Sequence, residues 1–455
     1  MKQKIRSVFS ILLAILLAIS MVSCNLDFSD LQNEPTCAHR WSNANCTHPK
    51  TCYLCNVTEG TVSAGDHAYV MGDDDYVCLY CGESAPELVK ACTHVSGKDT
   101  CPLCGMTARN VIKNVIYIIG DGMGLEHIAA GQLAYETDYA FEEWQFASVN
   151  TDSLTSGGRN QSELTDSAAA GTALATGVVT LNGYVGKDQN GNDLSTVLDY
   201  AKQKGKLTGV ISTDYLYGAT PAAFSAHSTD RDDYLTILTS QITSNVDLLC
   251  GQTSTSQALS DTVITQNGYR AYTSLDEIRA HAPGSGKLYC TLDMEETSLT
   301  EAPVKLSDVA TAALNALDSE NGFVLMIEQA HIDKASHNNQ FEQMAQAVNS
   351  LNDTVNAILA WLGDRTDTAI VLTADHETGD LSVSGSKTLP YSATLPNHTT
   401  VYYRFNSTSH TKANVGLFLY GADVQIERIS YFKTPYTVKN SDICNIVKRL
   451  INDQR

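Results

Sequence analysis

Short apolar runs alternate with amphipathic stretches over the part of the chain that follows residue 110. The apolar runs are rich in β-branched residues and predict strands at residues 115–119, 207–212, 323–327, 368–373 and 414–419. The stretches with helical spacing predict helices at residues 164–176, 195–206, 338–362 and 442–451, and Ser195 is a suitable N-cap for the second. Strands separated by helices are typical of a mainly parallel sheet with helices on both faces, so we expect an α/β domain at residues 110–455.

The first residues have the pattern of an export signal. Three cationic residues, Lys2, Lys4 and Arg6, precede an apolar run at residues 8–22 that is short for a membrane-spanning helix. The run ends at a cysteine, Cys24, and this ending resembles a bacterial lipobox. We therefore expect a lipoprotein signal peptide at residues 1–23, lipidation of Cys24 and a polar tether at residues 24–35, with an ordinary cleaved signal as the alternative. Lipidation predicts an exported chain that is lipid-anchored to the membrane surface at the bacterial cell envelope.

A segment rich in cysteine and histidine precedes the predicted α/β domain. It holds nine of the 13 cysteines, in recurring C-x-H and C-x-x-C pairs. Two kinds of cross-link fit these pairs: tetrahedral zinc sites, or disulfides in an exported protein. Because the segment has too little apolar material for a core, we expect a small zinc-ribbon-like module at residues 36–105. The candidate structural zinc ligands are Cys37, His39, Cys52, Cys55, His67, Cys78, Cys81, Cys92, His94, Cys101 and Cys104, with Cys46 as an additional candidate.

Charge and composition narrow the range of functions. The chain has 455 residues, with 30 Lys and Arg against 51 Asp and Glu, a formal net charge of −21. Such an acidic chain is unsuited to binding nucleic acid, which depends on basic surfaces. Hydrophobic residues make up 43% and charged residues 18%, which indicates a sizeable folded core. The single long apolar run lies at the N-terminus, which argues against several membrane-spanning helices.

Metal-ligating side chains gather at the ends of the predicted strands. In parallel sheets, sites form where the strands end at their carboxyl side. Carboxylates and imidazoles follow three of these strands, and His410 precedes the last one. Asp333 and His337 are four residues apart, so one helical turn would place them on the same face. The set that could build a metal cluster is Asp121, Glu328, Asp333, His337, Asp375, His376 and His410.

Ser167 opens a helical stretch of small residues. Its hydroxyl would lie at the helix N-terminus, where the backbone N–H groups favour negative charge. A serine in this place could act as a nucleophile that becomes a phosphoester, and it could also be an ordinary helix cap.

Six motifs in order resemble the alkaline phosphatase family over residues 110–455. They are Gly120-Asp121-Gly122-Met123-Gly124, Thr165-Asp166-Ser167-Ala168-Ala169, Ala219-Thr220-Pro221-Ala222-Ala223 through Arg231, Ile332-Asp333-Lys334 with His337, Thr373-Ala374-Asp375-His376-Glu377-Thr378-Gly379, and Ser409-His410-Thr411. The resemblance implies an alkaline phosphatase-like fold and an enzyme that hydrolyses small phosphate monoesters through a phosphoserine. It also implies two catalytic zinc ions and one magnesium ion, and it allows a homodimer.

The resemblance assigns a role to each motif residue. Ser167 would be the nucleophile, Arg231 would bind the phosphoryl oxygens, Asp166 would orient Arg231, and Lys334 could reach phosphate through water. Asp121, Asp375 and His376 would hold the zinc that activates Ser167. Asp333, His337 and His410 would hold a second zinc, and Thr220 and Glu328, with Asp121 bridging, would hold magnesium. Three such cations outweigh the four carboxylates, so the site would attract a dianionic phosphate in spite of the acidic chain.

The chain departs from the family pattern at Gly218. Family members commonly carry Asp or His two residues before Thr220, and that side chain helps to set the third metal site. His398 is a rival of His410 as a ligand, although no strand follows it. Cys250 and Cys290 could form a disulfide, with Cys444 buried or free.

Two other classes of function compete with the phosphatase. One is a relative of the same superfamily that acts on diesters or sulfate esters; these commonly use Thr or a modified Cys as the nucleophile, which Ser167 argues against. The other is a surface binding protein in which the phosphatase domain is silent, and the complete ligand sets argue against it.

Overall fold

The computed structural model describes residues 112–455 apart from 158–159, 253, 255, 295–303, 396–398, 422–436 and 453–455, together with four short strands before residue 112. The chain divides into two compact units, Met1–Asp66 and His67–Arg455. The first contains the antiparallel pair of β1 (Lys50–Thr51) and β2 (Thr58–Glu59), and the second also contains the antiparallel pair of β3 (Tyr69–Met71) and β4 (Tyr76–Cys78). The predictions for the signal peptide, the lipidated Cys24, the ligands of the Cys/His-rich module and His398 concern residues or side chains outside those described.

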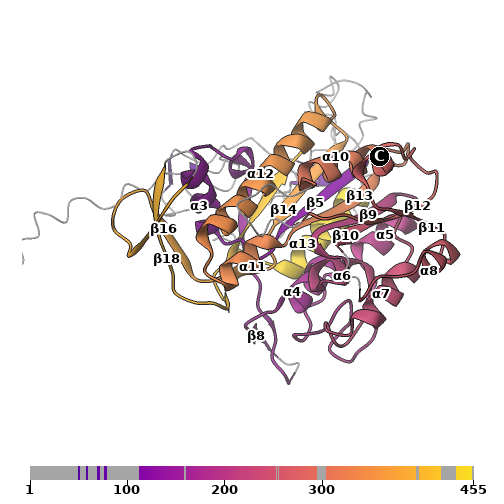
Figure 1. The fold of residues 1–455 in the computed structure, drawn as a ribbon, viewed down its shortest axis with the longest axis horizontal. Helices are drawn as coiled ribbons and strands as arrows, with labels where there is room; N and C mark the ends of the chain where they lie inside the picture. Colours follow the sequence, from indigo (N-terminus) through magenta and orange to yellow (C-terminus); the bar gives the residue numbers. More distant parts are fainter. Residues whose placement is uncertain are drawn as a thin grey trace, which may run out of the picture. The chain divides into compact units, whose positions relative to one another are not determined.

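A ten-stranded sheet forms the centre of the second unit (Figure 1). From the edge strand β11 across the sheet to β14, each strand is parallel to its neighbour. The next strand, β20, runs antiparallel to both β14 and β6. The sheet is therefore mainly parallel, as the alternation of strands and helices predicts. In spatial order the strands are β11 (Tyr269–Tyr272), β12 (Lys287–Thr291), β10 (Leu248–Gln252), β9 (Leu207–Tyr215), β13 (Phe323–Gln329), β5 (Asn114–Gly120), β14 (Thr368–Thr373), β20 (Val415–Tyr420), β6 (Gln145–Asn150) and β21 (Thr437–Lys439).

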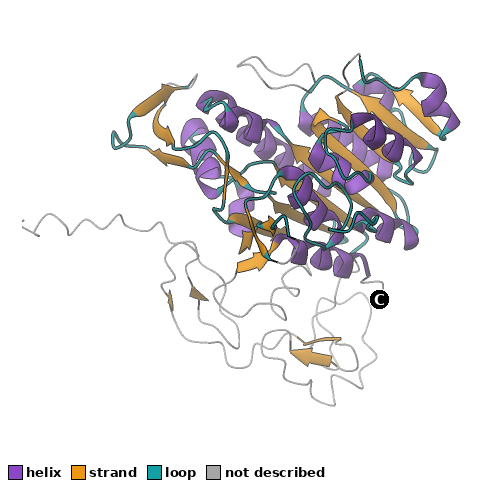
Figure 2. Cartoon of the chain, turned by 90° about the horizontal axis from the view of Figure 1, so that it is seen from below, coloured by secondary structure: helices purple, strands orange, loops and turns teal. Residues whose placement is uncertain are grey.

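Helices cover both faces of the sheet (Figure 2). On one face, α12 (Phe341–Leu362) packs against α3 (Leu125–Tyr135), α10 (Leu306–Leu317) and α11 (His331–His337). On the other face, α4 (Ser167–Thr176) packs against α6 (Ala219–Ser225) and α13 (Asn440–Asn452), and α13 also packs against α5 (Val197–Gln203). None of the described helices is both long enough and apolar enough to cross a membrane.

Smaller elements lie between these strands and helices. Residues between β14 and β20 form a three-stranded antiparallel sheet in the order β16, β18, β17 and a short pair of β15 with β19. The bounds of the remaining elements are η2 (Ala140–Trp144), β7 (Ser153–Leu154), β8 (Gln161–Glu163), α7 (Tyr234–Thr243), α8 (Asp261–Gln266), α9 (Leu275–Arg279), β15 (Glu377–Thr378), β16 (Leu381–Ser384), β17 (Tyr391–Thr394), β18 (Thr400–Phe405) and β19 (His410–Thr411).

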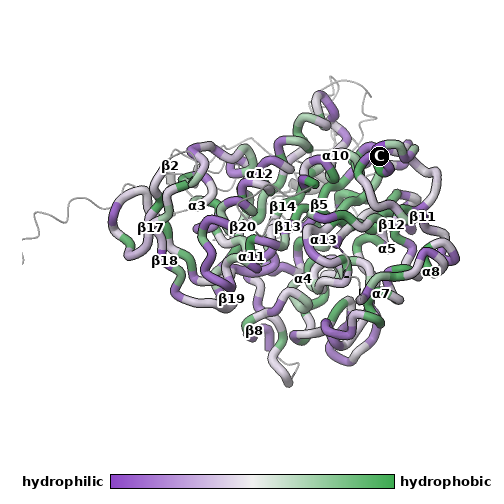
Figure 3. The backbone as a smooth tube through the Cα atoms, in the orientation of Figure 1, coloured by the Kyte–Doolittle hydropathy of each residue, from purple (hydrophilic) through white to green (hydrophobic). Residues whose placement is uncertain are grey.

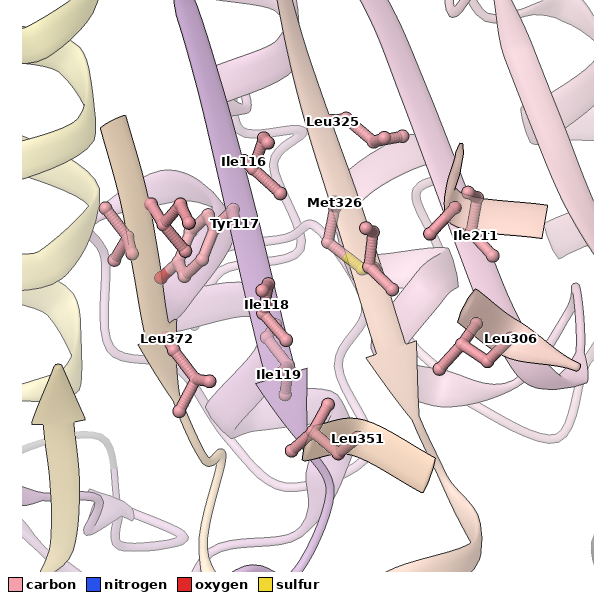
Figure 4. Packing of buried hydrophobic residues seen from close by; sticks show 14 of the residues in the cluster. Ile116, Tyr117, Ile118, Ile119, Ile211, Leu306, Leu325, Met326, Leu351 and Leu372 are labelled. Atoms are coloured by element: carbon pink, nitrogen blue, oxygen red, sulfur yellow. The ribbon is translucent and has the colours of Figure 1, made fainter. Parts of the chain in front are cut away.

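The hydrophobic core lies on both faces of the central strands. Every residue of β5, β13 and β14 is buried, as expected for parallel strands covered on both faces. In Figure 4, Leu351 of α12 lies near Ile119 of β5, and Leu306 of α10 lies near Ile211 of β9. In Figure 3 the tube along the central strands is mainly green, which marks hydrophobic residues. This rigid core fixes the strand ends that carry the candidate site.

Several predicted boundaries differ from the structure. The helix predicted from residue 164 begins at Ser167, because the side chain of Asp166 caps it and ends the extended segment before it. Ser195 does not cap α5; Thr196 does, in a capping box with Asp199. The helix predicted from residue 338 begins at Phe341, because Asn339 adopts a left-handed conformation (φ 53°) that separates α11 from α12.

The possible disulfide between Cys250 and Cys290 is not formed. The two residues face each other on the paired strands β10 and β12, where both are buried free thiols. Cys444 is also buried and free, and its thiol donates to the carbonyl oxygen of Ala175 on α4.

Candidate active site

Three neighbouring strands place the candidate ligands at one edge of the sheet. Glu328 of β13 and Thr373 of β14 both lie opposite Ile119 of β5 in the strand register. Asp121 and Asp375 each follow that row by two residues, so the parallel register brings them to the same level. Glu328 lies inside β13 rather than after its end, which corrects the predicted strand boundary.

The turn after β5 depends on a glycine. Gly122 has a φ of +74°, and a Cβ atom there would lie 2.8 Å from the Cα of Asp333. Its N–H donates to Oδ1 of Asp375 over 3.1 Å. Glycine therefore allows the turn to pass directly against α11 and draws the ends of β5 and β14 together.

The first cluster consists of Asp121, Asp375 and His376. Their candidate ligand atoms all lie within 4.8 Å of one another, and all three residues are buried. Nε2 of His376 lies 3.6 Å from Oδ1 of Asp121 and 3.2 Å from Oδ2 of Asp375. Burial first, and then the neighbouring histidines, lower the pKa of His376 well below its ordinary value, which keeps the imidazole neutral and suited to binding a metal.

The second cluster consists of Asp333, His337 and His410. Asp333 and His337 lie on one face of α11, with Nε2 of His337 at 3.3 Å from Oδ1 of Asp333. Nε2 of His410 lies 3.6 Å from the same oxygen. The structure thus brings together the i, i+4 pair predicted from the sequence and a histidine more than 70 residues away.

Hydrogen bonds to the outer nitrogens orient all three histidines. Nδ1 of His337 donates to the carbonyl oxygen of Thr408 over 2.6 Å, and Nδ1 of His410 donates to that of Thr165 over 2.8 Å. The hydroxyl of Thr378 donates to Asp333, so its oxygen accepts the proton on Nδ1 of His376. Each Nε2 therefore keeps its lone pair toward a cluster, which is the usual arrangement of a metal-binding histidine.

Ser167 lies beside the first cluster, at the start of α4. Its Oγ is 3.2 Å from Nε2 of His376, and the residue is 5% exposed. Asp166 caps the helix by accepting from the N–H of Ala169 over 2.9 Å. The other carboxylate oxygen of Asp166 accepts from Nη1 of Arg231 over 3.1 Å. One side chain thus positions both the helix that carries the hydroxyl and the guanidinium that could bind an anion next to it.

A third group of side chains lies around Glu328, near Asp121. Glu328 accepts a hydrogen bond from the hydroxyl of Ser212 on β9, and Thr220 of α6 lies near the same carboxylate. Burial raises the pKa of Glu328 to about 8, and the negative charges of Asp214 and Asp375 add to the rise. Residues in or just after four strands, β5, β9, β13 and β14, therefore converge with Thr220 of α6 on a single group of carboxylates.

The buried oxygen atoms of this group fit bound cations. Oδ1 of Asp121, Oδ2 of Asp375 and Oγ1 of Thr220 are buried and have no hydrogen-bond partner within the described part of the chain. Burial, followed by the charges of neighbouring carboxylates, raises the pKa of Asp121 well above its ordinary value. Buried oxygens that lack partners and carboxylates that repel one another are both satisfied by divalent cations. The donor types also match: histidine and carboxylate suit zinc, and oxygen donors alone suit magnesium.

Without metal, the stability of the chain should fall as pH rises. In the unfolded chain Glu328 loses its proton near pH 4.5, whereas in the fold it keeps the proton to about pH 8. Between these values this carboxyl holds more protons in the folded state than in the unfolded state, so its titration favours unfolding as pH rises. We expect the melting temperature of chelator-treated protein to decline from about pH 6.5, above which the buried histidines are neutral in both states, to about pH 8.

Two comparisons check the origin of that decline. Replacing Glu328 by Gln should make it less steep, since that side chain no longer titrates while Asp121 and Asp375 still do. Added zinc and magnesium should remove it, since cations take the place of protons. A decline of equal slope in the Glu328→Gln variant would show that the titration of this carboxyl is not its cause.

Some residues of the site were not predicted. Thr378, Ser212 and Asp214 all contact predicted site residues, yet the sequence analysis gave them no role. Thr378 lies inside a quoted motif, which was a usable signal. Lys334 forms an ion pair with Asp214, and its contact with phosphate through water stays a prediction.

Comparisons with known proteins agree with this architecture. A sequence model of the alkaline phosphatase family matches residues 112–262 and 287–441, which is more than half of the chain. The chain is 31% identical over 305 residues to alkaline phosphatase 4 of Bacillus subtilis strain 168, covering 60% of this chain and 63% of that protein. It is 28% identical over 347 residues to the alkaline phosphatase of Escherichia coli K12, covering 62% and 74%. The chain spans 57% to 63% of the length of the first three curated relatives that it matches.

The fold also matches a solved structure. The cold-active alkaline phosphatase from a Shewanella species superposes with a TM-score of 0.64 at 23% identity, over 74% of this chain and 99% of that chain. At this level of identity the likeness concerns the fold.

Proposed function

Because the chain belongs to the alkaline phosphatase family, we propose that it hydrolyses phosphate monoesters through a covalent phosphoserine on Ser167. One observation carries this proposal. The hydroxyl of Ser167 lies 3.2 Å from Nε2 of His376, while the adjacent Asp166 binds Arg231. A nucleophile, a cluster of metal ligands and an anion-binding side chain thus meet at one point, which a silent binding domain would not require.

The residues that would hold each metal follow from the three groups. Asp121, Asp375 and His376 would hold one zinc, and Asp333, His337 and His410 would hold the second. Thr220 and Glu328, with Asp121, would hold magnesium. When bound, such cations favour the ionised form of a serine hydroxyl or a water and stabilise charge on the attacking and leaving oxygens.

The side chains of the protein bind the phosphoryl group and carry out the transfer. Arg231 offers two parallel N–H groups to two phosphoryl oxygens, and its contact with Asp166 fixes its direction. Oγ of Ser167 attacks phosphorus as the bond to the alcohol oxygen breaks, so the alcohol leaves and a serine phosphoester remains. Water then attacks that phosphoester, releases inorganic phosphate and returns the hydroxyl to Ser167.

A cavity beside the second cluster supports the proposal that a phosphate ester binds here. It has a volume of about 380 Å³ and is lined by residues of α11 and the start of α12, including His331, Lys334 and His337. Because His337 belongs both to this cavity and to the second cluster, the cavity offers room for the alcohol part of a substrate.

The test of the proposal compares three esters of one phenol. Protein loaded with zinc and magnesium should hydrolyse p-nitrophenyl phosphate. Its kcat/KM for this monoester should exceed that for the diester bis(p-nitrophenyl) phosphate by about 10⁴-fold, because a site built to bind an anionic oxygen discriminates strongly against a substrate that lacks it. The sulfate ester p-nitrophenyl sulfate is the second comparison. Preference for the diester or the sulfate would replace the proposal with one of the related superfamily activities, and inactivity on all three would favour a silent domain.

A further inference from the structure

A carboxylate that the family motifs do not include lies beside the third group. Asp214 belongs to β9, and its backbone N–H donates to Oγ of Ser212 over 2.9 Å. The hydroxyl of Ser212 in turn donates to Glu328. Asp214 is therefore linked by two hydrogen bonds to the carboxylate that would hold magnesium. Its side chain is 20% exposed, so it lies mostly inside the site.

The two oxygens of Asp214 face different partners. Oδ1 accepts from the ammonium group of Lys334, which lies over the ring of Tyr215 with Nζ 5.8 Å from the ring centroid. Oδ2 lies on the side of Gly218, where a Cβ atom would be 3.2 Å away from it. One oxygen thus faces the more exposed Lys334, and the other faces the start of α6, the helix that carries Thr220.

The backbone does not require glycine at position 218. Gly218 has φ −55° and ψ 153°, which any residue adopts. The constraint is spatial, because an added Cβ would lie 2.9 Å from the carbonyl oxygen of Tyr215 and 3.2 Å from Oδ2 of Asp214. The carboxylate of Asp214 therefore lies next to the space that a side chain at position 218 would fill.

We propose that Asp214 completes the shell of the third cation, in place of the side chain that position 218 lacks. The inference rests on the proposed function, since it assumes that Thr220 and Glu328 hold a divalent cation. An independent observation points to that cation: Oγ1 of Thr220 is buried and without a hydrogen-bond partner among the described residues, on a side chain that is 1% exposed.

The chemistry of the group favours magnesium. All its donors are oxygens, from Thr220, Glu328, Asp121 and Asp214. Magnesium binds through one or two carboxylates and keeps several of its waters, so a carboxylate at the edge of the group stabilises it by charge and by orienting those waters. The same side chain binds Lys334 through its other oxygen, so the third cation and Lys334 share one carboxylate.

The test measures magnesium binding directly. The full-length protein is saturated with zinc and titrated with Mg²⁺ alone, and binding is followed by the melting temperature and by the magnesium retained after gel filtration. Asp214→Asn keeps the size of the side chain and removes its charge, and it should weaken Mg²⁺ binding by about 10- to 100-fold. Mg²⁺ binding equal to that of the wild type would overturn the proposal.

Lys334→Gln is the matched control. It breaks the same ion pair from the other side but leaves the carboxylate in place. Because it removes a positive charge near the cation, this variant should bind Mg²⁺ at least as tightly as the wild type. Equal weakening in Asp214→Asn and Lys334→Gln would show that Asp214 only holds Lys334, and would overturn the proposal.

A rescue variant tests whether the carboxylate of Asp214 takes the place of a side chain at position 218. Gly218→Asp alone should be destabilised, because its new side chain meets Asp214 and the carbonyl oxygen of Tyr215. In combination with Asp214→Ala the competing carboxylate is gone and only the carbonyl group of Tyr215 has to shift, so the new carboxylate should restore Mg²⁺ binding to within about 10-fold of the wild type. A folded double variant that binds Mg²⁺ no better than Asp214→Ala would contradict the shared space. Loss of the proposed function would appear separately, as a wild type that binds Mg²⁺ but does not hydrolyse p-nitrophenyl phosphate.

Discussion

Replacing Ser167 by alanine should lower kcat for p-nitrophenyl phosphate by about 10⁴-fold or more, because Ser167 carries the hydroxyl that would form the covalent intermediate. Oγ of Ser167 makes its one described hydrogen bond to His376, and alanine is well suited to the first turn of α4. The variant should therefore keep its fold and its metal content while losing turnover. Steady-state kinetics, with metal analysis of the same sample, measure both.

Ser225→Ala is the matched control for that variant. Ser225 is as buried as Ser167, at 5% exposure, and also lies on a short helix. Its hydroxyl donates to the carbonyl oxygen of Pro221 and accepts from Gln241, away from both ligand clusters. The control should cost stability and leave kcat close to that of the wild type. Turnover by Ser167→Ala at the level of the control would remove Ser167 as the nucleophile.

Replacing His376 by alanine should remove one zinc ion per chain and lower kcat by more than about 100-fold. Nε2 of His376 is within 3.6 Å of ligand oxygens on Asp121 and Asp375, so its loss opens the first cluster. Through Thr378 it is also linked to Asp333 of the second cluster, so the affinity for the remaining zinc should fall as well. Zinc per chain, measured by mass spectrometry of the metal, is compared with that of the wild type.

The difference between variant and wild type is the useful quantity, since any zinc held by the Cys/His-rich module contributes equally to both. His281→Ala is the control, because His281 is 7% exposed and bonds to Tyr272 and Ser285, in a part of the fold without candidate ligands. An unchanged zinc content in His376→Ala would exclude His376 as a ligand.

The sequence predicts the sheet well where strand and ligand signals coincide. Residues 368–373 match β14 in full, because the strand is uniformly buried and ends at the polar Asp375 and His376. Glu328 was placed after its strand, since a carboxylate inside a buried strand contradicts the hydrophobic pattern. Only the packing of β13 between β9 and β5 shows how a buried carboxylate is accommodated there.

The role of Asp214 lay beyond the sequence for a different reason. In the sequence, its position four residues before Gly218 gives no indication that the two residues are related. The relation follows only from the fold: β9 and α6 lie together, and the missing side chain of Gly218 leaves room for a carboxylate from the strand. Such a departure from a motif is thus explained by the residues that lie around it in space, and the sequence alone does not show which residues these are.

The most direct test of the central claim is to find the phosphate on the protein during turnover. Protein loaded with zinc and magnesium is mixed with p-nitrophenyl phosphate, stopped with acid and digested, and the peptide that contains Ser167 is sequenced by mass spectrometry. We predict a phosphoserine at Ser167 that is absent from Ser167→Ala. Continued turnover with no phosphate on Ser167, or with phosphate on another residue, would contradict the proposed mechanism.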